Sequence, residues 1–178
     1  MVRVGEVDDA VLNAMTRAVA DHLGMETIAD PEPIATQPAF DAKRRQYSSS
    51  LLLQQIAGRW KPEFERVLGV TEVDLFIPML SYIFGQAQLG GRSAIVSAAR
   101  LRQEFYDMPA DEPVLLERAR KEALHELGHT FGLVHCEDRG CAMSLSTNIR
   151  QVDLKNASYC LACRALLAEG GVAPGEFE

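Results

Sequence analysis

Three histidines and one glutamate in the last third of the chain have the spacing of a metal site. His125, Glu126 and His129 form the pattern H-E-x-x-H on a stretch that reads as helix, so both imidazoles should lie on one helix face. Glu126 can reach a water on a bound ion without being a ligand itself. Gly132 allows a sharp turn, after which His135 can return as a third nitrogen ligand. Three neutral imidazoles, one open coordination position and an adjacent carboxylate are the layout of a catalytic zinc site.

All four cysteines of the chain follow this pattern. They are Cys136, Cys141, Cys160 and Cys163, and their spacings, C-x4-C and C-x2-C, fit tetrahedral ligation by four thiolates. We expect the second pair at the start of a helix, where the helix dipole favours the thiolate form. In a reducing compartment such a cluster favours metal binding, with two disulfides or a redox-active C-x-x-C pair as the alternatives.

Met143 stands eight residues after His135 and extends the histidine pattern. An H-E-x-x-H motif with a following glycine, a third histidine and a downstream methionine turn is the signature of the metzincin peptidases. We therefore expect Met143 to pack beneath the metal site as an apolar floor. The alternative is an ordinary core methionine, and one side chain can fill both roles.

Together these motifs resemble those of the archaemetzincin family. The resemblance rests on Cys136 directly after the third histidine, on the run Cys136-x4-Cys141-x-Met143, and on the later pair Cys160-x2-Cys163. It extends upstream and covers roughly residues 40–165. The upstream segments that carry it are Leu68–Thr71, Val73–Pro78, Phe84–Ala87 and Val96–Leu101.

The resemblance implies two zinc ions per chain, one catalytic and one structural. His125, His129 and His135 would hold the catalytic zinc, and Glu126 would be the general base. A structural zinc would be held by the four thiolates of Cys136, Cys141, Cys160 and Cys163. The implied activity is hydrolysis of peptide bonds through a zinc-bound water, with a peptide or protein as substrate. Internal cleavage and removal of amino-terminal residues both remain open.

The elements that must position these residues follow from hydrophobic period and capping residues. Asp111 and Pro113 mark the start of a long helix that should run to about Phe131 and carry the H-E-x-x-H motif. Further helices are predicted over residues 8–24, about 40–57 and 157–167.

Strands are predicted between these helices. Short apolar runs indicate them over Val73–Ile77, Tyr82–Leu89 and Ser93–Ala98, with a hairpin turn at Gly90. A substrate peptide would lie extended along an edge strand, for which Gln86–Leu89 is the candidate.

The order of these elements predicts an α/β (α+β) fold of metzincin type. We expect a mixed twisted sheet with packed helices, a long active-site helix and a small zinc-bearing C-terminal lobe. Residues 1–178 would form a single metallopeptidase domain. The N-terminal lobe would span about 1–132, and the C-terminal lobe, with the methionine turn and the four cysteines, about 133–178.

Composition narrows the classes of protein. The chain has 178 residues, of which 47% are hydrophobic and 24% charged, as expected for one globular domain. With 18 Lys and Arg against 25 Asp and Glu, the net charge of −7 argues against a nucleic-acid binder. The sequence has neither an apolar run long enough for a membrane span nor a signal-peptide core at its start. We therefore expect a cytoplasmic protein without membrane or nucleic-acid partners, and a monomer.

Two other functions compete with peptide hydrolysis. One is a non-catalytic zinc module for protein binding, which would need neither Glu126 nor an open ligand position. The other is a zinc-dependent endoribonuclease, in which the three histidines have the same spacing. Glu126 and the acidic net charge argue against the ribonuclease, because RNA chemistry favours a basic groove.

Overall fold

A four-stranded sheet with the order β1-β4-β7-β6 is the centre of the computed structural model, which describes residues 1–172. β1 (Val2–Val4), β4 (Val67–Thr71) and β7 (Ser93–Ser97) run parallel to one another. β6 (Gly85–Ala87) pairs antiparallel with β7 and forms one edge of the sheet. This mixed sheet with its helices has the α/β class that the sequence predicts.

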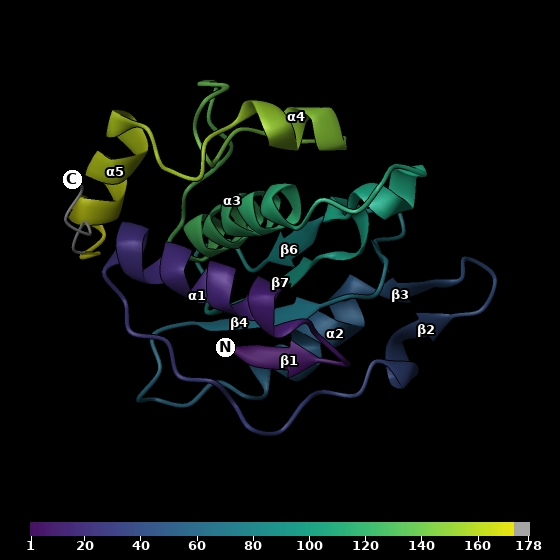
Figure 1. Cartoon of the computed structure of the whole chain (residues 1–178). Coiled ribbons are helices and arrows are strands. Elements are labelled where there is room, and N and C mark those ends of the chain that lie inside the picture. Colours follow the sequence, from purple (N-terminus) through teal and green to yellow (C-terminus); the bar gives the residue numbers. More distant parts are fainter. Residues whose placement is uncertain (173–178) are drawn as a thin grey trace.

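Helices cover both faces of this sheet (Figure 1). α1 (Asp9–Leu23) and α3 (Glu112–Thr130) pack on one face, against alternate residues of β4 and β7 such as Val70 and Val96. α2 (Ser49–Ala57) packs on the other face, against Ile95. The two faces differ because successive residues of a strand point in opposite directions.

Shorter elements complete the described chain. A three-stranded sheet has the order β2-β3-β5, formed by β2 (Phe40–Asp41), β3 (Gln46–Ser48) and β5 (Leu75–Phe76). Single 3₁₀ turns are η1 (Gln37–Ala39), η2 (Ala99–Leu101) and η3 (Gln103–Tyr106). After α3 come α4 (Ile149–Leu154), which lies along α3 in Figure 1, and α5 (Leu161–Glu169). The last six residues of the predicted C-terminal lobe, 173–178, lie outside the described residues.

Within residues 1–172, none of the helices combines the length and the apolar character needed to cross a bilayer.

The predicted helices over 8–24 and 111–131 are confirmed, and so are their caps. The Asp8 carboxylate accepts a hydrogen bond from the backbone N–H of Ala10 at 2.9 Å, and Gly24 ends α1 with φ +62°. The Asp111 carboxylate accepts from the backbone N–H of Val114 at 3.1 Å, as an N-cap of α3.

The helix predicted over about 40–57 is wrong in its first half, where the chain forms β2, a tight turn and β3. The Asp41 carboxylate accepts hydrogen bonds from the backbone N–H groups of Lys43 at 2.8 Å and Arg44 at 3.0 Å. These bonds compete with the first turn of a helix, and Arg45 has φ +56°, which a helix excludes. The helix therefore begins only at Ser49, although it ends before Gly58 as predicted.

The last helix begins later than the predicted 157, at Leu161. The preceding segment instead pairs with the loop of Cys141: Ala142 donates to Ser158 at 2.8 Å, and Asn156 donates to Gly140 at 2.9 Å, both between backbone groups. β1, β4 and α4 were not predicted as elements. The strands predicted over 73–77 and 82–89 are shorter in the structure, where β5 has two residues and β6 has three.

Candidate metal and peptidase site

α3 carries His125, Glu126 and His129 near its carboxyl end, and a glycine turn brings the third histidine back. Gly132 follows the helix with φ +90°, a conformation that side-chain-bearing residues rarely adopt. The chain then reverses so that the ring centroid of His135 lies 5.3 Å from that of His125 and 5.0 Å from that of His129. The sharp turn expected from the sequence therefore brings the three predicted imidazoles together.

The three imidazoles lie close enough together to share one metal ion. One ring nitrogen of each lies within 4.8 Å of the others. The Nδ1 atoms of His125 and His129 contact the carbonyl oxygens of Ala142 at 2.8 Å and Leu133 at 2.7 Å. An N–H group at Nδ1 can donate to each carbonyl, and this tautomer leaves the lone pair on Nε2 for a metal.

The spacing of these lone pairs fits a zinc ion. The Nε2 atoms of His125 and His129 are 3.2 Å apart. Two nitrogens about 2.1 Å from one ion, at a tetrahedral angle, lie about 3.4 Å apart. Burial lowers the pKa of all three imidazoles, most strongly for His125, and so favours the neutral form that binds metal.

Glu126 lies beside this cluster and is 5% exposed. A Cβ atom at Gly85 in the edge strand would lie 2.6 Å from both Cγ and Oε1 of Glu126, so only glycine fits there. Burial raises the pKa of the Glu126 carboxyl well above its usual range, and Glu122 raises it further while Lys155 opposes the rise. A buried carboxylate with a raised pKa is suited to accept a proton during catalysis.

A buried ion pair that sequence reasoning missed lies next to Glu126. The Nζ atom of Lys155 is 2.8 Å from Oε1 of Glu122, and the two side chains are 0% and 3% exposed. Glu122 precedes Glu126 by one helical turn and lines the same cleft. The pair therefore joins the active-site helix to the segment that follows α4.

These groups line one wall of a cleft of about 520 Å³. The cleft has two rims. One rim is the segment that contains β6, and the other is the segment after Met143. The cleft is lined by residues 80–87 and Leu89, by Glu122, His125, Glu126, His129, Val134 and His135, and by residues 145–147. An extended chain could therefore lie between β6 and α3, across the histidines.

The four cysteines form a second cluster. Their sulfur atoms lie within 4.8 Å of one another, and all four are free thiols. The Sγ atoms of Cys136 and Cys160 are 3.8 Å apart, about the separation of two thiolates bound 2.3 Å from one tetrahedral zinc. The backbone N–H groups of Met143 and Cys160 donate to Sγ of Cys141 at 3.4 and 3.3 Å, which stabilises a thiolate there.

Met143 lies between the two clusters and is fully buried. A Cβ atom at Gly128 would lie 2.4 Å from Sδ of Met143, so the methionine packs directly against the helix between the two histidines. Tyr159, which the sequence analysis missed, closes this floor, and its hydroxyl donates to the carbonyl of Leu124 at 2.7 Å. A glycine inside a helix is a signal of close packing, and it could have identified Gly128.

Comparison with known proteins matches these features to one family. The family model for peptidase family M54 matches residues 35–169. The chain is 42% identical over 170 residues to an archaemetzincin of Methanocaldococcus jannaschii. The aligned region covers 95% of this chain and 92% of the relative.

Solved archaemetzincin structures are similar throughout. The archaemetzincin of Methanopyrus kandleri has a TM-score of 0.81 at 36% identity, covering 95% of this chain and 92% of that one. The structure from Archaeoglobus fulgidus, a complex with malonate, has a TM-score of 0.79 at 31% identity, covering 93% and 97%. The chain therefore belongs to peptidase family M54, the archaemetzincins, as its motifs predicted.

Proposed function

We propose that this zinc-dependent peptidase hydrolyses peptide bonds at the cleft between β6 and α3, with His125, His129 and His135 as the ligands of the catalytic zinc. The observation that carries the proposal is the convergence of three imidazole nitrogens beside a buried carboxylate on the wall of one cleft. The predictions of a peptidase function and of the archaemetzincin family are confirmed by the family match. The rival ribonuclease and zinc-module functions are not favoured.

Each side chain at this site has a distinct role in the proposed reaction. A zinc ion bound there supplies Lewis-acid polarisation of a carbonyl and a lowered pKa for a bound water. The carbonyls of Ala142 and Leu133 hold His125 and His129 in the ligating tautomer. Glu126 takes a proton from the attacking water and passes it to the leaving amine.

The edge of the sheet supplies a binding surface for an extended substrate. Backbone hydrogen bonds from Ser97 to Phe84 and from Gln88 to Ser93 identify the even-numbered residues as those that pair with β7. The N–H and C=O groups of Gly85 and Ala87 therefore point away from β7, toward the free edge. A peptide added there would gain main-chain hydrogen bonds without a demand on its side chains.

The four thiolates of Cys136, Cys141, Cys160 and Cys163 would hold the second zinc in a closed, structural site. Four sulfur ligands leave no open coordination position, so this ion would stabilise the C-terminal lobe instead of taking part in hydrolysis. The chain would then contain two zinc ions. We also propose that it acts as a cytoplasmic monomer without nucleic-acid or membrane partners. Size-exclusion chromatography with light scattering checks the monomeric state.

Two substitutions separate the proposed roles. Glu126→Gln is nearly isosteric and removes only the proton acceptor, so zinc content should hold while the rate falls about 10²–10⁴-fold. His129→Ala removes a ligand, so zinc of the open site and activity should be lost together. The measurements are elemental analysis and digestion of a peptide library read by mass spectrometry. Retention of a tenth of wild-type activity by Glu126→Gln would exclude Glu126 as the base.

A further inference from the structure

The two rims of the cleft are joined at one end. The hydroxyl of Tyr82, on the rim before β6, donates to the carbonyl oxygen of Thr147, on the rim after Met143, at 2.9 Å. Both residues line the cleft. We propose that this bridge closes the cleft and restricts substrates to those whose carboxyl terminus lies within about three residues of the cleaved bond. The inference rests on the proposed peptidase site and defines which part of a peptide that site accepts.

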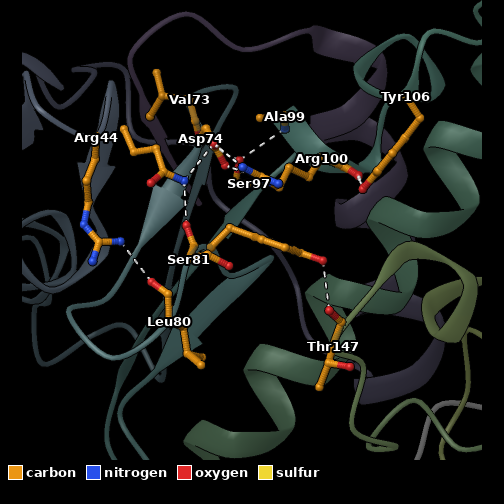
Figure 2. A network of polar contacts seen from close by, with 12 residues as sticks. Arg44, Val73, Asp74, Leu80, Ser81, Ser97, Ala99, Arg100, Tyr106 and Thr147 are labelled. Atoms are coloured by element: carbon orange, nitrogen blue, oxygen red, sulfur yellow. Dashed lines mark hydrogen bonds and ion pairs between the residues drawn. The ribbon is translucent and has the colours of Figure 1, made fainter.

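The tyrosine side of the bridge is built into the fold. The guanidinium of Arg100 lies over the Tyr82 ring, 4.0 Å from its centroid. Arg100 is itself fixed by Asp74, with Nε–Oδ1 at 2.6 Å and Nη2–Oδ2 at 2.7 Å (Figure 2). The Phe84 ring packs edge-on at 5.6 Å between centroids. These contacts hold the ring in one orientation before a substrate arrives.

The backbone that leads into Tyr82 is anchored by the same network. The Gln46 amide nitrogen donates to the Asp74 carboxylate and to the carbonyl of Ser81, both at 2.9 Å. Figure 2 shows Asp74 and Arg100 next to each other near Ser81, with Thr147 on a separate segment. This rim therefore cannot move away from the facing segment without breaking the partly buried hydrogen bonds of Gln46.

The threonine side is held by α4. The backbone N–H and the hydroxyl of Thr147 both donate to Oε1 of Gln151, at 2.7 and 3.0 Å. The backbone N–H of Gln151 in turn donates to Oδ1 of Asn148 at 3.2 Å. Because both rims are fixed, the Tyr82–Thr147 bridge is a wall of the cleft and not a chance contact of two loose loops.

The position of the wall sets how much substrate fits beside it. Glu126 lies against Gly85, and Tyr82 precedes Gly85 by three residues. At about 3.3 Å per residue, an extended chain covers this distance of about 10 Å with roughly three residues. At the opposite end, the backbone N–H of Gly90 donates to the carbonyl oxygen of His129 at 2.9 Å, which joins the end of β6 to α3 and not to the rim after Met143, and Leu89 is 63% exposed.

Strand direction decides which end of the peptide meets the wall. β6 presents a free edge, and antiparallel pairing is both commoner and somewhat more stable than parallel pairing. A peptide antiparallel to β6 runs with its amino end near Leu89 and its carboxyl end toward Tyr82. The enzyme would then release short peptides from the carboxyl end of its substrates.

The test uses one peptide library in three forms: unextended, extended at its carboxyl end by ten Gly and Ser residues, and extended equally at its amino end. The zinc-loaded wild type should cut the amino-extended library near its carboxyl end. It should cut the library positions of the carboxyl-extended form at least about tenfold more slowly. Tyr82→Ala should remove most of this difference, and Tyr82→Phe should reduce it by about 3- to 10-fold, the effect of one hydrogen bond.

Tyr106→Phe is the matched control. Its hydroxyl donates to the carbonyl of Arg100 at 3.0 Å, so it belongs to the same network (Figure 2), but it does not line the cleft. The ratio of the two extended libraries should stay at the wild-type value in this variant. Equal cutting of both extended forms by wild type, or cuts confined to the amino end, would overturn the inference.

A binding measurement separates this inference from the peptidase proposal. The same libraries are passed over immobilised, zinc-loaded Glu126→Gln protein with and without Tyr82→Ala, and retained peptides are identified by mass spectrometry. Selective retention of amino-extended peptides without cutting by wild type would support the wall and refute the peptidase site. Cutting of all library forms without selective retention would support the peptidase site and refute the wall. If the libraries are neither retained nor cut, both proposals are refuted.

Discussion

Glu126 is positioned by a glycine on a neighbouring strand as much as by its own helix. Gly85 lets the edge strand approach so closely that any Cβ atom would overlap Glu126, and on the other side the carbonyl oxygen of Ile95 would lie only 2.7 Å away. The Glu126 carboxylate therefore lies directly against the backbone of β6, on the cleft that the histidines also line. If Glu126 is the base, as we propose, a carboxylate held in this way needs no reorganisation before it accepts a proton.

Gly85→Ala should accordingly damage catalysis more than stability. The new methyl group would lie 2.6 Å from Glu126 and 2.7 Å from the Ile95 carbonyl oxygen of β7, so the side chain of Glu126 must move and the strand must adjust slightly. We expect a rate about 10²-fold lower, with unchanged zinc content and a loss of about 1–3 kcal/mol in the free energy of unfolding. Gly58→Ala, at the end of α2 with φ −67°, is the control and should stay within about twofold of wild type. Near-normal activity of Gly85→Ala would show that the position of Glu126 is not set by β6.

Two adjacent faces of α3 have different functions. One face carries the proposed zinc ligands His125 and His129, and another carries a row one turn apart formed by Arg118, Glu122 and Glu126. Arg118 binds Asp153 through Nε at 2.6 Å and Nη2 at 2.8 Å, which fastens α4 to the helix. The row ends at Glu126 in the cleft, so the packing of α4 is linked to the position of the proposed base.

Lys155→Met should be strongly destabilising, because it leaves the Glu122 carboxylate buried without a partner. We expect a loss of about 3–5 kcal/mol in the free energy of unfolding of the zinc-loaded protein, measured in denaturant. The double variant Lys155→Met with Glu122→Leu should recover much of this loss, since no charge is then buried. Asp21→Asn breaks an exposed pair with Arg120 at 3.9 Å and should change stability by under about 0.5 kcal/mol. Additive effects of Lys155→Met and Glu122→Leu would contradict a direct pair.

Patterns within a short stretch of sequence identified the elements and the proposed ligands that depend on local geometry. The caps at Asp8 and Asp111 defined α1 and α3, and the histidine spacing requires only one helix and one turn. Contacts between segments far apart in the sequence leave no comparable pattern in the sequence itself. β1 was missed because three residues became a strand only by pairing with β4. Lys155 and Gly85 were missed because nothing near them in the sequence indicates Glu122 or Glu126 as a neighbour.

Over the whole molecule, the two metal clusters share one short segment of chain. His135 and Cys136 are adjacent, and the backbone N–H of Cys136 donates to the carbonyl of Met143 at 2.9 Å. The same loop supplies the Ala142 carbonyl that orients His125. An ion held by the four thiolates would therefore fix the loop that carries His135 and the Ala142 carbonyl, on which the position of His125 depends.

The difference in exposure between the two clusters predicts the order in which a chelator removes metal. His135 is exposed at the cleft, whereas Cys141 and Cys163 are 1% and 5% exposed. Zinc should leave in two phases: one equivalent quickly, with loss of activity and unchanged circular dichroism, and the second slowly, together with the structure of the C-terminal lobe. Cys163→Ser should bind neither zinc ion well and should melt at a lower temperature. Three thiolates hold the structural zinc poorly, and without that ion the loop of Ala142 no longer orients His125. His129→Ala should lose only the fast phase and keep the slow one. Release of both equivalents in a single phase would contradict the predicted order. A Cys163→Ser protein that melts at the wild-type temperature under reducing conditions would show that the thiolate cluster does not stabilise the C-terminal part of the chain.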